Sequence, residues 1–287
     1  MLKPYADHVN ATLQLMLGTV ACMNEHPAEL LAARRKARAS AEEYLHYATN
    51  WSIDTSRVDS IAWSGYAVDT IISGVSGLGR SRYDHEKPTE VRIPWMNSGR
   101  AALHIERPVG YLIPQAWHEV IERLKLDRVP MHPLDKEKTY VVEVQRIEDF
   151  TNVRQPYEGH FLHRYIQATS SMDTVTAAVG DMFVPMGHAT DALVMEILEP
   201  RCSDSFFAWG FFDSILQQKE WFSDYVFEDI AADLLAKDPV LQAELEAERI
   251  RDPEFAADAW AQLYFVYKRS PYFEPSYRRY PVLRIVQ

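Results

Sequence analysis

The chain has 287 residues, of which 47% are hydrophobic and 25% charged, and its formal net charge is −11 at pH 7. This length exceeds the usual size of one domain, so one large unit or two to three small packed units are expected. The apolar content can fill a sizeable core and argues against a disordered chain. An acidic balance without a basic stripe argues against nucleic acid and anionic membranes as partners.

The two cysteines, Cys22 and Cys202, lie far apart in the sequence. We interpret them as a pair of buried free thiols, with a single disulfide as the alternative, and they form no metal-type cluster. The N-terminus lacks the basic region, apolar core and cleavage site of a signal peptide, and no apolar run is long enough to span a bilayer. We therefore expect a soluble chain without membrane insertion, and its compartment stays open.

The first part of the chain predicts a pair of helices. Pro4 suits a first helical turn, and apolar residues then recur at helical spacing on one face. These residues are Tyr5, Val9, Leu13, Met16, Val20 and Met23. Pro27 interrupts the pattern, and a second helix is predicted over 28–44, with a solvated basic cluster at 34–38. Because a large exposed apolar patch is unusual, we expect the stripe to be covered by the second helix, another copy or a missing domain.

The middle of the chain is rich in β-prone segments. Strands are predicted over 58–63, 66–72, 91–95, 109–113, 139–147, 161–168, 173–179 and 182–184. A helix over 115–126 separates the fourth of these from the fifth, with Val120, Ile121 and Leu124 facing inward. The glycine-containing run 74–79 lacks the Lys-Ser/Thr ending and strand-to-helix setting of a phosphate loop, so it is predicted to be an ordinary loop.

The segment 198–235, here called the aromatic segment, is unusually dense in aromatic residues. They are Phe206, Phe207, Trp209, Phe211, Phe212, Trp221, Phe222, Tyr225 and Phe227. Ser203 or Asp204 is placed to cap a helix over 207–216, and Ser223 or Asp224 to cap one over 226–235. Such density indicates a core or an interface, and a helical clasp filling the core is the favoured interpretation. A face that grips a sugar or a peptide is the alternative.

These changes of period predict an α+β fold with an N-terminal helical pair, a strand-rich middle and a helical, aromatic-rich C-terminal third. Further helices are expected at 189–198, 238–250 and 255–267, and a final strand at 279–285. We expect three parts. They are a helical segment over 1–46, a small β-rich region over 47–107 and an α+β C-terminal domain over 108–287.

Histidine motifs in the chain do not complete a metal site. His26 and Glu29 have the H-x-x-E spacing of a zinc pair in some peptidases, but they straddle a helix break and lack a third ligand. We interpret this match as chance. His160 and His163 lie three apart in a predicted strand, so they face opposite sides. His132 stands alone beside a proline.

Carboxylate and serine motifs are equally incomplete. Two adjacent pairs occur, Glu148 with Asp149 and Glu228 with Asp229. Adjacency in sequence does not set the separation that glycoside hydrolysis requires, so both are interpreted as solvated acids. Ser64 and Ser76 each precede a glycine but lack the strand-to-helix elbow of a nucleophilic serine. The residues alone predict no catalytic and no metal-binding position, and they leave binding residues unassigned.

Several longer runs are more specific than these motifs. They are 107–108 with 111–117 (YLIPQAW), 157–160 (YEGH), 198–200 with 204–212 (DSFFAWGFF) and 218–220, and 270–273 (SPYF) with 279–282 (RYPV). Together these runs resemble the long C-terminal portion of bacterial M14-type, carboxypeptidase A-like zinc metallocarboxypeptidases. The resemblance covers nearly the whole chain, and the aromatic segment is its most specific part.

The resemblance places 1–5 just after the family's catalytic glutamate, at the start of the last helix of the peptidase domain. It therefore implies that the zinc ligands, the substrate-binding arginine and that glutamate lie upstream of Met1. No functional residue carries over, and zinc is implied for complete family members but not for this chain. We expect an accessory region that is inactive alone and whose partner is an upstream peptidase domain or a second copy. A free-standing peptide- or glycan-binding module is the alternative, followed by an unrecognised enzyme.

Overall fold

A computed structural model describes residues 4–43 and 45–286, and the fold is α+β as predicted. The chain forms two compact units, Met1–Tyr44 with Arg107–Gln287 and Leu45–Glu106. The first is called the main unit below, and the second the ribbon unit. The structure thus divides the chain into two units. The finer division into three parts, expected from the sequence, stays a prediction.

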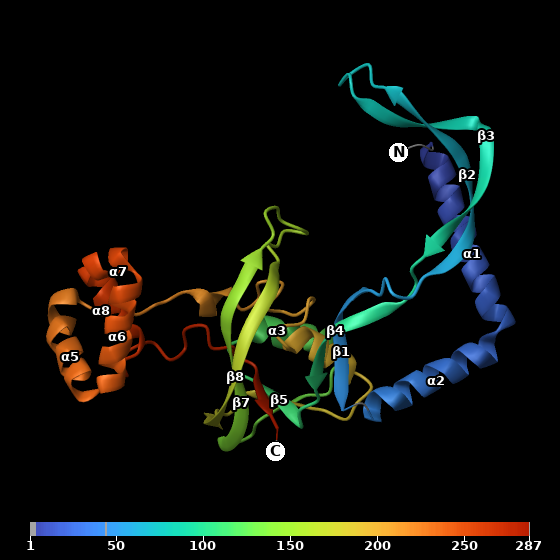
Figure 1. Ribbon diagram of the computed structural model, residues 1–287. Coiled ribbons are helices and arrows are strands. Elements are labelled where there is room, and N and C mark those ends of the chain that lie inside the picture. The colour runs from blue at the N-terminus through green and yellow to red at the C-terminus, as the bar shows by residue number, and fades with distance from the viewer. Residues whose placement is uncertain (1–3, 44, 287) are drawn as a thin grey trace. The chain divides into compact units, whose positions relative to one another are not determined.

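A six-stranded antiparallel sheet organises the main unit (Figure 1). Its order is β6 (His132–Pro133), β9 (Met182–Pro185), β5 (Gly110–Ile113), β10 (Leu283–Ile285), β7 (Lys138–Asn152) and β8 (His163–Ala177). All four residues of β5 are buried, and Leu112 packs with Val142, Val144 and Leu283 in the sheet's core cluster. The strands expected at 161–168 and 173–179 are one strand, because pairing with β7 carries β8 through the polar stretch between them.

Two helices pack in the main unit around this sheet. α3 (His118–Leu126) buries Val120, Ile121 and Leu124, as its spacing predicted. α4 (Asp191–Leu198) buries Val194, Met195 and Leu198. The final strand is shorter than the predicted 279–285, since Pro281 has no N–H to donate to a ladder.

The first half of the aromatic segment is not the helix predicted over 207–216. It forms a series of turns that ends in the 3-10 helix η1 (Asp213–Leu216). Gly210 has a φ of 79°, a left-handed conformation that an α-helix does not contain. The turns bury Phe206, Phe207 and Phe212. The core interpretation therefore holds for these three rings.

The second half of the aromatic segment begins a helical bundle. Its members are α5 (Asp224–Lys237), α6 (Pro239–Arg251), α7 (Pro253–Ala257) and α8 (Ala259–Lys268). Ser223 stands at the N-cap of α5 without a side-chain capping bond, whereas Asp238 caps α6 by accepting from Val240 and Leu241. The helix predicted over 255–267 is split because Asp258 caps a new helix, accepting from the backbone N–H of Ala261.

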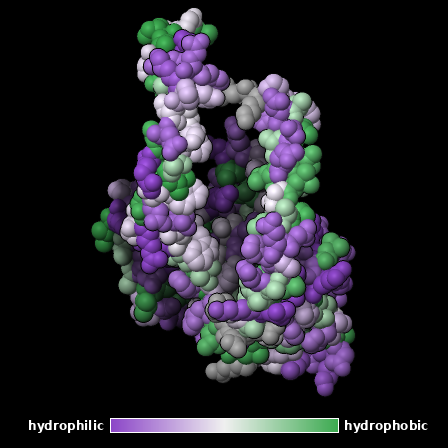
Figure 2. Space-filling model, turned by 90° about the vertical axis from the view of Figure 1, so that its right-hand side faces the viewer, coloured by the Kyte–Doolittle hydropathy of each residue, from purple (hydrophilic) through white to green (hydrophobic). Residues whose placement is uncertain are grey.

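The N-terminal helices are α1 (Tyr5–Glu25) and α2 (Pro27–Glu43), close to the predicted pair. None of the described side chains of α1 is buried, so α2 does not cover the apolar stripe as one expectation had it. Leu13 is 50% exposed and Met16 63%. Figure 2 views the molecule from the right-hand side of Figure 1, where α1 and α2 are drawn, and shows apolar surface among hydrophilic residues. Cys22 on α1 is exposed and Cys202 is buried, and they form no disulfide, so the expected pair of buried thiols is wrong for Cys22.

The ribbon unit consists of two antiparallel pairs. β1 (His46–Ile53) pairs with β4 (Gly99–Glu106), and β2 (Asp59–Ile72) pairs with β3 (Gly79–Trp95). The short strands predicted between 58 and 95 are parts of β2 and β3. The run 74–79 is the predicted loop as far as 78, and its last residue, Gly79, is the first residue of β3. In this fully described unit only Thr49 and Ile105 are buried.

Candidate functional site

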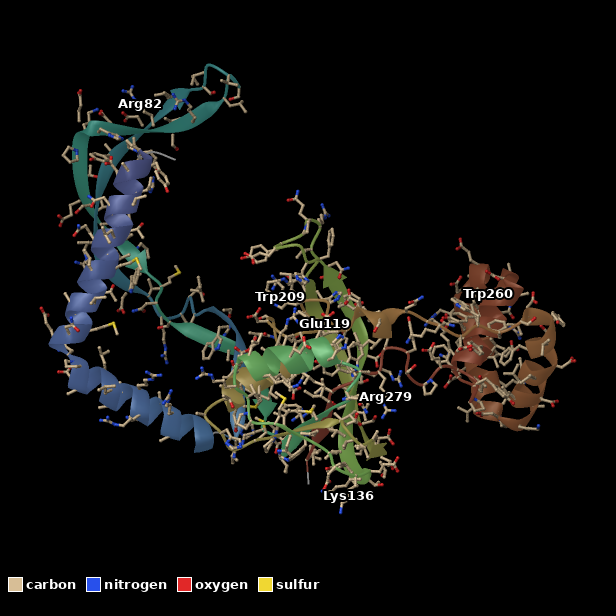
Figure 3. The ribbon with its side chains drawn as sticks, turned by 180° about the vertical axis from the view of Figure 1, so that it is seen from behind. Arg82, Glu119, Lys136, Trp209, Trp260 and Arg279 are labelled. Carbon is tan, nitrogen blue, oxygen red and sulfur yellow. The ribbon has the colours of Figure 1, made fainter. Side chains whose placement is uncertain are left out.

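The aromatic segment and the start of α3 border an open cavity of about 340 Å³, here called the aromatic pocket. Its walls include Trp117, Glu119, Arg123, His160, Trp209 and Phe211. Figure 3 shows Glu119 and Trp209 close together in the main unit. Three separate stretches of sequence therefore contribute side chains to one space.

The wall of the aromatic pocket that α3 forms begins just after the end of β5. Pro114 ends the strand, and the backbone N–H of Trp117 donates to the Pro114 carbonyl at 3.0 Å, which turns the chain into the helix. Glu119 and Arg123 lie four residues apart and so share one face of α3. The Arg123 guanidinium donates through Nη1 to the Glu119 backbone oxygen at 2.9 Å. One acidic and one basic side chain thus stand together at the pocket.

The opposite wall depends on Gly210. Its left-handed backbone sits between Trp209 and Phe211, and both of these rings line the pocket. The indole Nε1 of Trp209 donates to Oδ1 of Asp204 at 2.6 Å, which fixes the ring's orientation. A side chain at position 210 would meet the Asp213 carboxylate at 3.2 Å.

His160 enters the pocket from a tight turn. Tyr157 and His160 exchange two backbone hydrogen bonds of 2.9 Å. Glu158 and Gly159 between them both have positive φ, the geometry of a type I′ hairpin turn. The run YEGH, one of those that carry the family resemblance, is therefore a turn that holds His160 against the aromatic segment.

The rings meet at steep angles. The His160 ring lies 5.4 Å from Trp209 at an interplanar angle of 79°, and 6.0 Å from Phe211 at 21°. Trp209 and Phe211 are consequently steeply inclined to one another and form a corner. The Arg123 guanidinium lies 4.3 Å from the Phe211 centroid, a cation–π contact. The pocket can hold a group with an apolar or planar part and a polar part beside it.

A second polar cluster lies inside the fold. Glu199 is 2% exposed, and it accepts from the Tyr111 hydroxyl at 2.6 Å and from Gln145 Nε2 at 2.7 Å. Nε of Arg284 lies 3.3 Å from both Glu199 and Glu143. Burial, and then the charge of Glu199, raise the pKa of Tyr111 well above its ordinary value. Because the carboxylate is surrounded by donors, this cluster is a structural one.

The histidines singled out from the sequence have separate surroundings. Nδ1 of His26 lies 3.5 Å from Glu29 at the exposed junction of α1 and α2. His163 is buried, with ring nitrogens 2.8 Å from Asn152 and 2.7 Å from Asp213, whereas His160 lines the aromatic pocket. The ring of His132 contacts the Phe183 ring edge-on. Across residues 4–43 and 45–286, no three His, Cys, Asp or Glu side chains converge as a metal site would require.

The carboxylates and serines are also scattered. Glu148 accepts from the Thr169 hydroxyl at 2.7 Å, beside Asp149 in β7. Glu228 and Asp229 are exposed on α5. Ser64 lies within β2, and the Ser76 hydroxyl accepts from the Leu78 N–H in the loop between β2 and β3.

Among the helices in the described part of the chain, none has the length and apolarity needed to span a membrane.

Sequence reasoning missed the part that α3 plays in the pocket. Trp117, Glu119 and Arg123 belong to no motif of catalytic or binding residues. A signal was nevertheless present, because the runs YLIPQAW, YEGH and DSFFAWGFF carried the family resemblance. Trp117, His160 and Trp209 come from these three runs and line the same cavity.

Comparison with known proteins gives a loose relationship to a carboxypeptidase. The chain is 27% identical over 111 residues to Carboxypeptidase 2 of Trichophyton tonsurans. The match covers 39% of this chain and 20% of that protein, so it spans only about a fifth of the relative's length. No protein-family profile matches the chain. No solved structure matches it.

Proposed function

We propose that the chain is an accessory region of an M14-type zinc metallocarboxypeptidase-like protein. In this proposal a peptidase domain upstream hydrolyses the peptide, and the chain assists that domain without hydrolysing peptides itself. The observation that carries the proposal is the similarity to Carboxypeptidase 2 over 111 residues. The wider family resemblance of the runs in the main unit supports the finer assignment to the M14 type.

The exposed stripe of α1 supports a partner for this region. Fully burying an apolar side chain contributes about 1.5–3 kcal/mol, so several such residues together can hold an interface. The residues available are Val9, Leu13, Met16 and Val20, each at least half exposed. We propose the peptidase domain as the occupant, because the resemblance places α1 as the continuation of that domain. A second copy of the chain is the alternative outcome of the test.

The decisive experiment assays the chain alone and within its parent protein. The purified chain with added zinc is expected to release no C-terminal amino acids from peptides, and metal analysis should find far less than one zinc per chain. The parent protein lacking this region should lose hydrolytic activity or solubility. A stoichiometric, chelator-sensitive zinc with peptidase activity in the chain alone would overturn the proposal.

A specific observation favours a second function. The aromatic pocket combines the Trp209 and Phe211 rings with the charged groups of Glu119 and Arg123. This combination suits the binding of a peptide or a glycan, whether the chain works beside a peptidase domain or alone.

A further inference from the structure

We propose that a second cavity of the main unit binds a small apolar carboxylate, with the apolar group inside the cavity and the carboxylate at Lys219 and Arg279. An apolar C-terminal residue of a peptide and a free apolar carboxylic acid share this chemistry. The proposal goes beyond the proposed function and rests on this cavity alone.

The cavity lies beside η1 and is called the η1 cavity below. Its volume is about 350 Å³, near the lower end of the range that is usual for small-molecule sites. The turn before α3, β8, η1 and the segment leading into β10 all contribute to it. Its apolar walls are Trp117, Val175, Ile215, Tyr280, Pro281 and Leu283. The size therefore suits one small apolar group and not a long chain.

The deepest walls of the η1 cavity are apolar and held in place by hydrogen bonds. Ile215, Tyr280 and Leu283 are buried. The Tyr280 hydroxyl donates to the Leu198 carbonyl at 2.7 Å, so this side chain offers its ring and not its hydroxyl to the cavity. The Arg278 backbone N–H donates to the Ile215 carbonyl at 2.8 Å and joins two of the walls. Water is poorly accommodated against such walls, whereas an apolar group gains by burial there.

The charged side chains that border the η1 cavity are both basic. They are Lys219 and Arg279, and the described lining contains no Asp or Glu. The chain as a whole has a net charge of −11, and the lining of the aromatic pocket includes Glu119. A basic border on an apolar cavity is therefore a local exception in an acidic protein. It favours an anionic group at the mouth, and a carboxylate matches both a guanidinium and an ammonium.

Each cation has a carboxylate neighbour outside the lining, and neither neighbour uses up its donors. Arg279 donates through Nη2 to Oδ2 of Asp173 at 2.9 Å, and a guanidinium carries several further N–H donors. Nζ of Lys219 lies 3.6 Å from Oε1 of Glu274, which is longer than a hydrogen bond. The Glu274 oxygens accept instead from the Lys219 backbone N–H and the Ser276 hydroxyl. The two neighbours weaken the positive field, so we expect binding of modest affinity.

The test uses the full chain and calorimetric titration with acetyl-phenylalanine. Acetyl-phenylalanine amide keeps the ring without the charge, and acetylglycine keeps the charge without the ring. We expect acetyl-phenylalanine to bind with a dissociation constant below about 1 mM, and each of the other two at least about tenfold more weakly.

Two further probes distinguish the sources of the carboxylate. They are 3-phenylpropanoic acid, which has no amide, and acetyl-Gly-Gly-Phe with a free C-terminus. Tighter binding of the peptide assigns the η1 cavity to peptide C-termini. Equal or tighter binding of 3-phenylpropanoic acid assigns it to free carboxylic acids.

Charge variants assign the binding to this cavity. Lys219→Gln and Arg279→Gln should each weaken acetyl-phenylalanine at least about fivefold, whereas Lys219→Arg keeps the charge and should bind within about twofold of the unchanged chain. Lys136→Gln is the matched control and should leave the affinity unchanged, because Lys136 is an exposed lysine that lines a different cavity of the main unit (Figure 3). Near-ultraviolet circular dichroism checks that each variant is folded.

Asp173→Asn supplies a test in the opposite direction. The change removes the negative charge that lies 2.9 Å from the Arg279 guanidinium. Binding of acetyl-phenylalanine should therefore become severalfold tighter, because the ligand's carboxylate no longer competes with Asp173. A purely structural role of Arg279 would not produce tighter binding.

The proposal is wrong if acetyl-phenylalanine and its amide bind equally, if acetylglycine binds as tightly as either, or if acetyl-phenylalanine does not bind. It is also wrong if neither Lys219→Gln nor Arg279→Gln weakens binding, whereas weakening in one of them alone assigns the carboxylate to that cation. These outcomes are separate from the accessory function. A parent protein that loses activity without this region, while the η1 cavity binds no carboxylate, would leave that function standing and reject the ligand.

Discussion

The Tyr111 hydroxyl donates a 2.6 Å hydrogen bond to Oε1 of Glu199, a residue 88 positions later in the chain. This bond ties β5 in the sheet to the residue that follows α4. Glu199 also accepts from Gln145 of β7 and faces Arg284 of β10, so one buried carboxylate links three neighbouring strands. Removing the Glu199 carboxylate should therefore lower the stability of the whole main unit and not of one element alone.

Tyr111→Phe should lower the free energy of unfolding by about 1.5–3 kcal/mol, the usual contribution of a hydrogen bond to a charged group. The variant keeps the ring but removes the hydroxyl that donates to Oε1 of the buried Glu199, while the Arg284 guanidinium stays 3.3 Å from that oxygen. Urea denaturation measures the change. Tyr165→Phe is the matched control, because Tyr165 is 85% exposed and its hydroxyl can reach water. Equal stability of the two variants would show that the Tyr111–Glu199 bond contributes nothing.

The chain should lose stability in alkaline solution. Burial raises the pKa values of Tyr111 and Tyr280 well above the ordinary 10.0, and the Glu199 charge adds to this effect. A group whose pKa is raised on folding contributes stability that is complete below the unfolded value and is lost as the pH rises above it. The melting temperature should therefore fall increasingly steeply above about pH 10. Tyr111→Phe should flatten that fall, and an identical profile for the variant would contradict the assignment.

Glu274 should make the chain sensitive to acid. The Lys219 backbone N–H donates to its Oε2 at 2.7 Å, and the Ser276 hydroxyl donates to its Oε1 at 2.7 Å. These bonds hold the pKa of Glu274 below its ordinary value of 4.5. Stability from a lowered pKa is present above the unfolded value and is lost as the pH falls through the folded one.

Glu274→Gln should consequently be less stable than the unchanged chain at pH 7, by about 1–3 kcal/mol, and the difference should shrink below pH 4.5. Denaturant titrations at several pH values measure it. Glu254→Gln, at an exposed position in α7, supplies the control and should show no such dependence. A difference that stays constant from pH 7 to pH 3 would argue against a role for the Glu274 charge.

Leu13→Asp and Met16→Asp should each weaken the association of α1 with its partner at least tenfold, because a charge placed in an apolar interface loses its water. Gln14→Asp, on the same helix but outside the apolar stripe, is the control. Co-purification with the separately expressed peptidase domain measures association, and light scattering measures the mass of the chain alone. Loss of a dimer in light scattering would assign the stripe to a second copy. Unchanged mass, melting and co-purification would show that the stripe is not an interface.

The parts of the fold that follow from the sequence are those in which local pattern and burial agree. The spacing of Val120, Ile121 and Leu124 predicts α3 and its inward face, and the structure buries all three. Pairing between distant segments is not visible in such patterns. The polar middle of β8 is a strand because β7 lies beside it, and neither strand's own sequence indicates the other.

The aromatic segment shows what a local sequence pattern does not predict. Aromatic density correctly indicated a core for Phe207 and Phe212, but helical spacing failed because Gly210 reverses the local backbone. The same reversal presents Trp209 and Phe211 to the pocket. A sequence gives the residue types of such a site, whereas its assembly depends on α3 and a hairpin turn that lie far away along the chain.

Because almost none of its side chains are buried, the ribbon unit can serve as a probe for a bound partner in solution. With Thr49 and Ile105 as its buried residues, its strands are maintained mainly by their backbone ladders, and a two-stranded ribbon is only marginally stable alone. Amide hydrogens of β2 and β3 should therefore exchange with deuterated solvent within seconds, while those of β5 persist until the whole unit opens. Slow exchange in Leu45–Glu106 would then report directly that a partner covers the ribbon, whatever the identity of that partner.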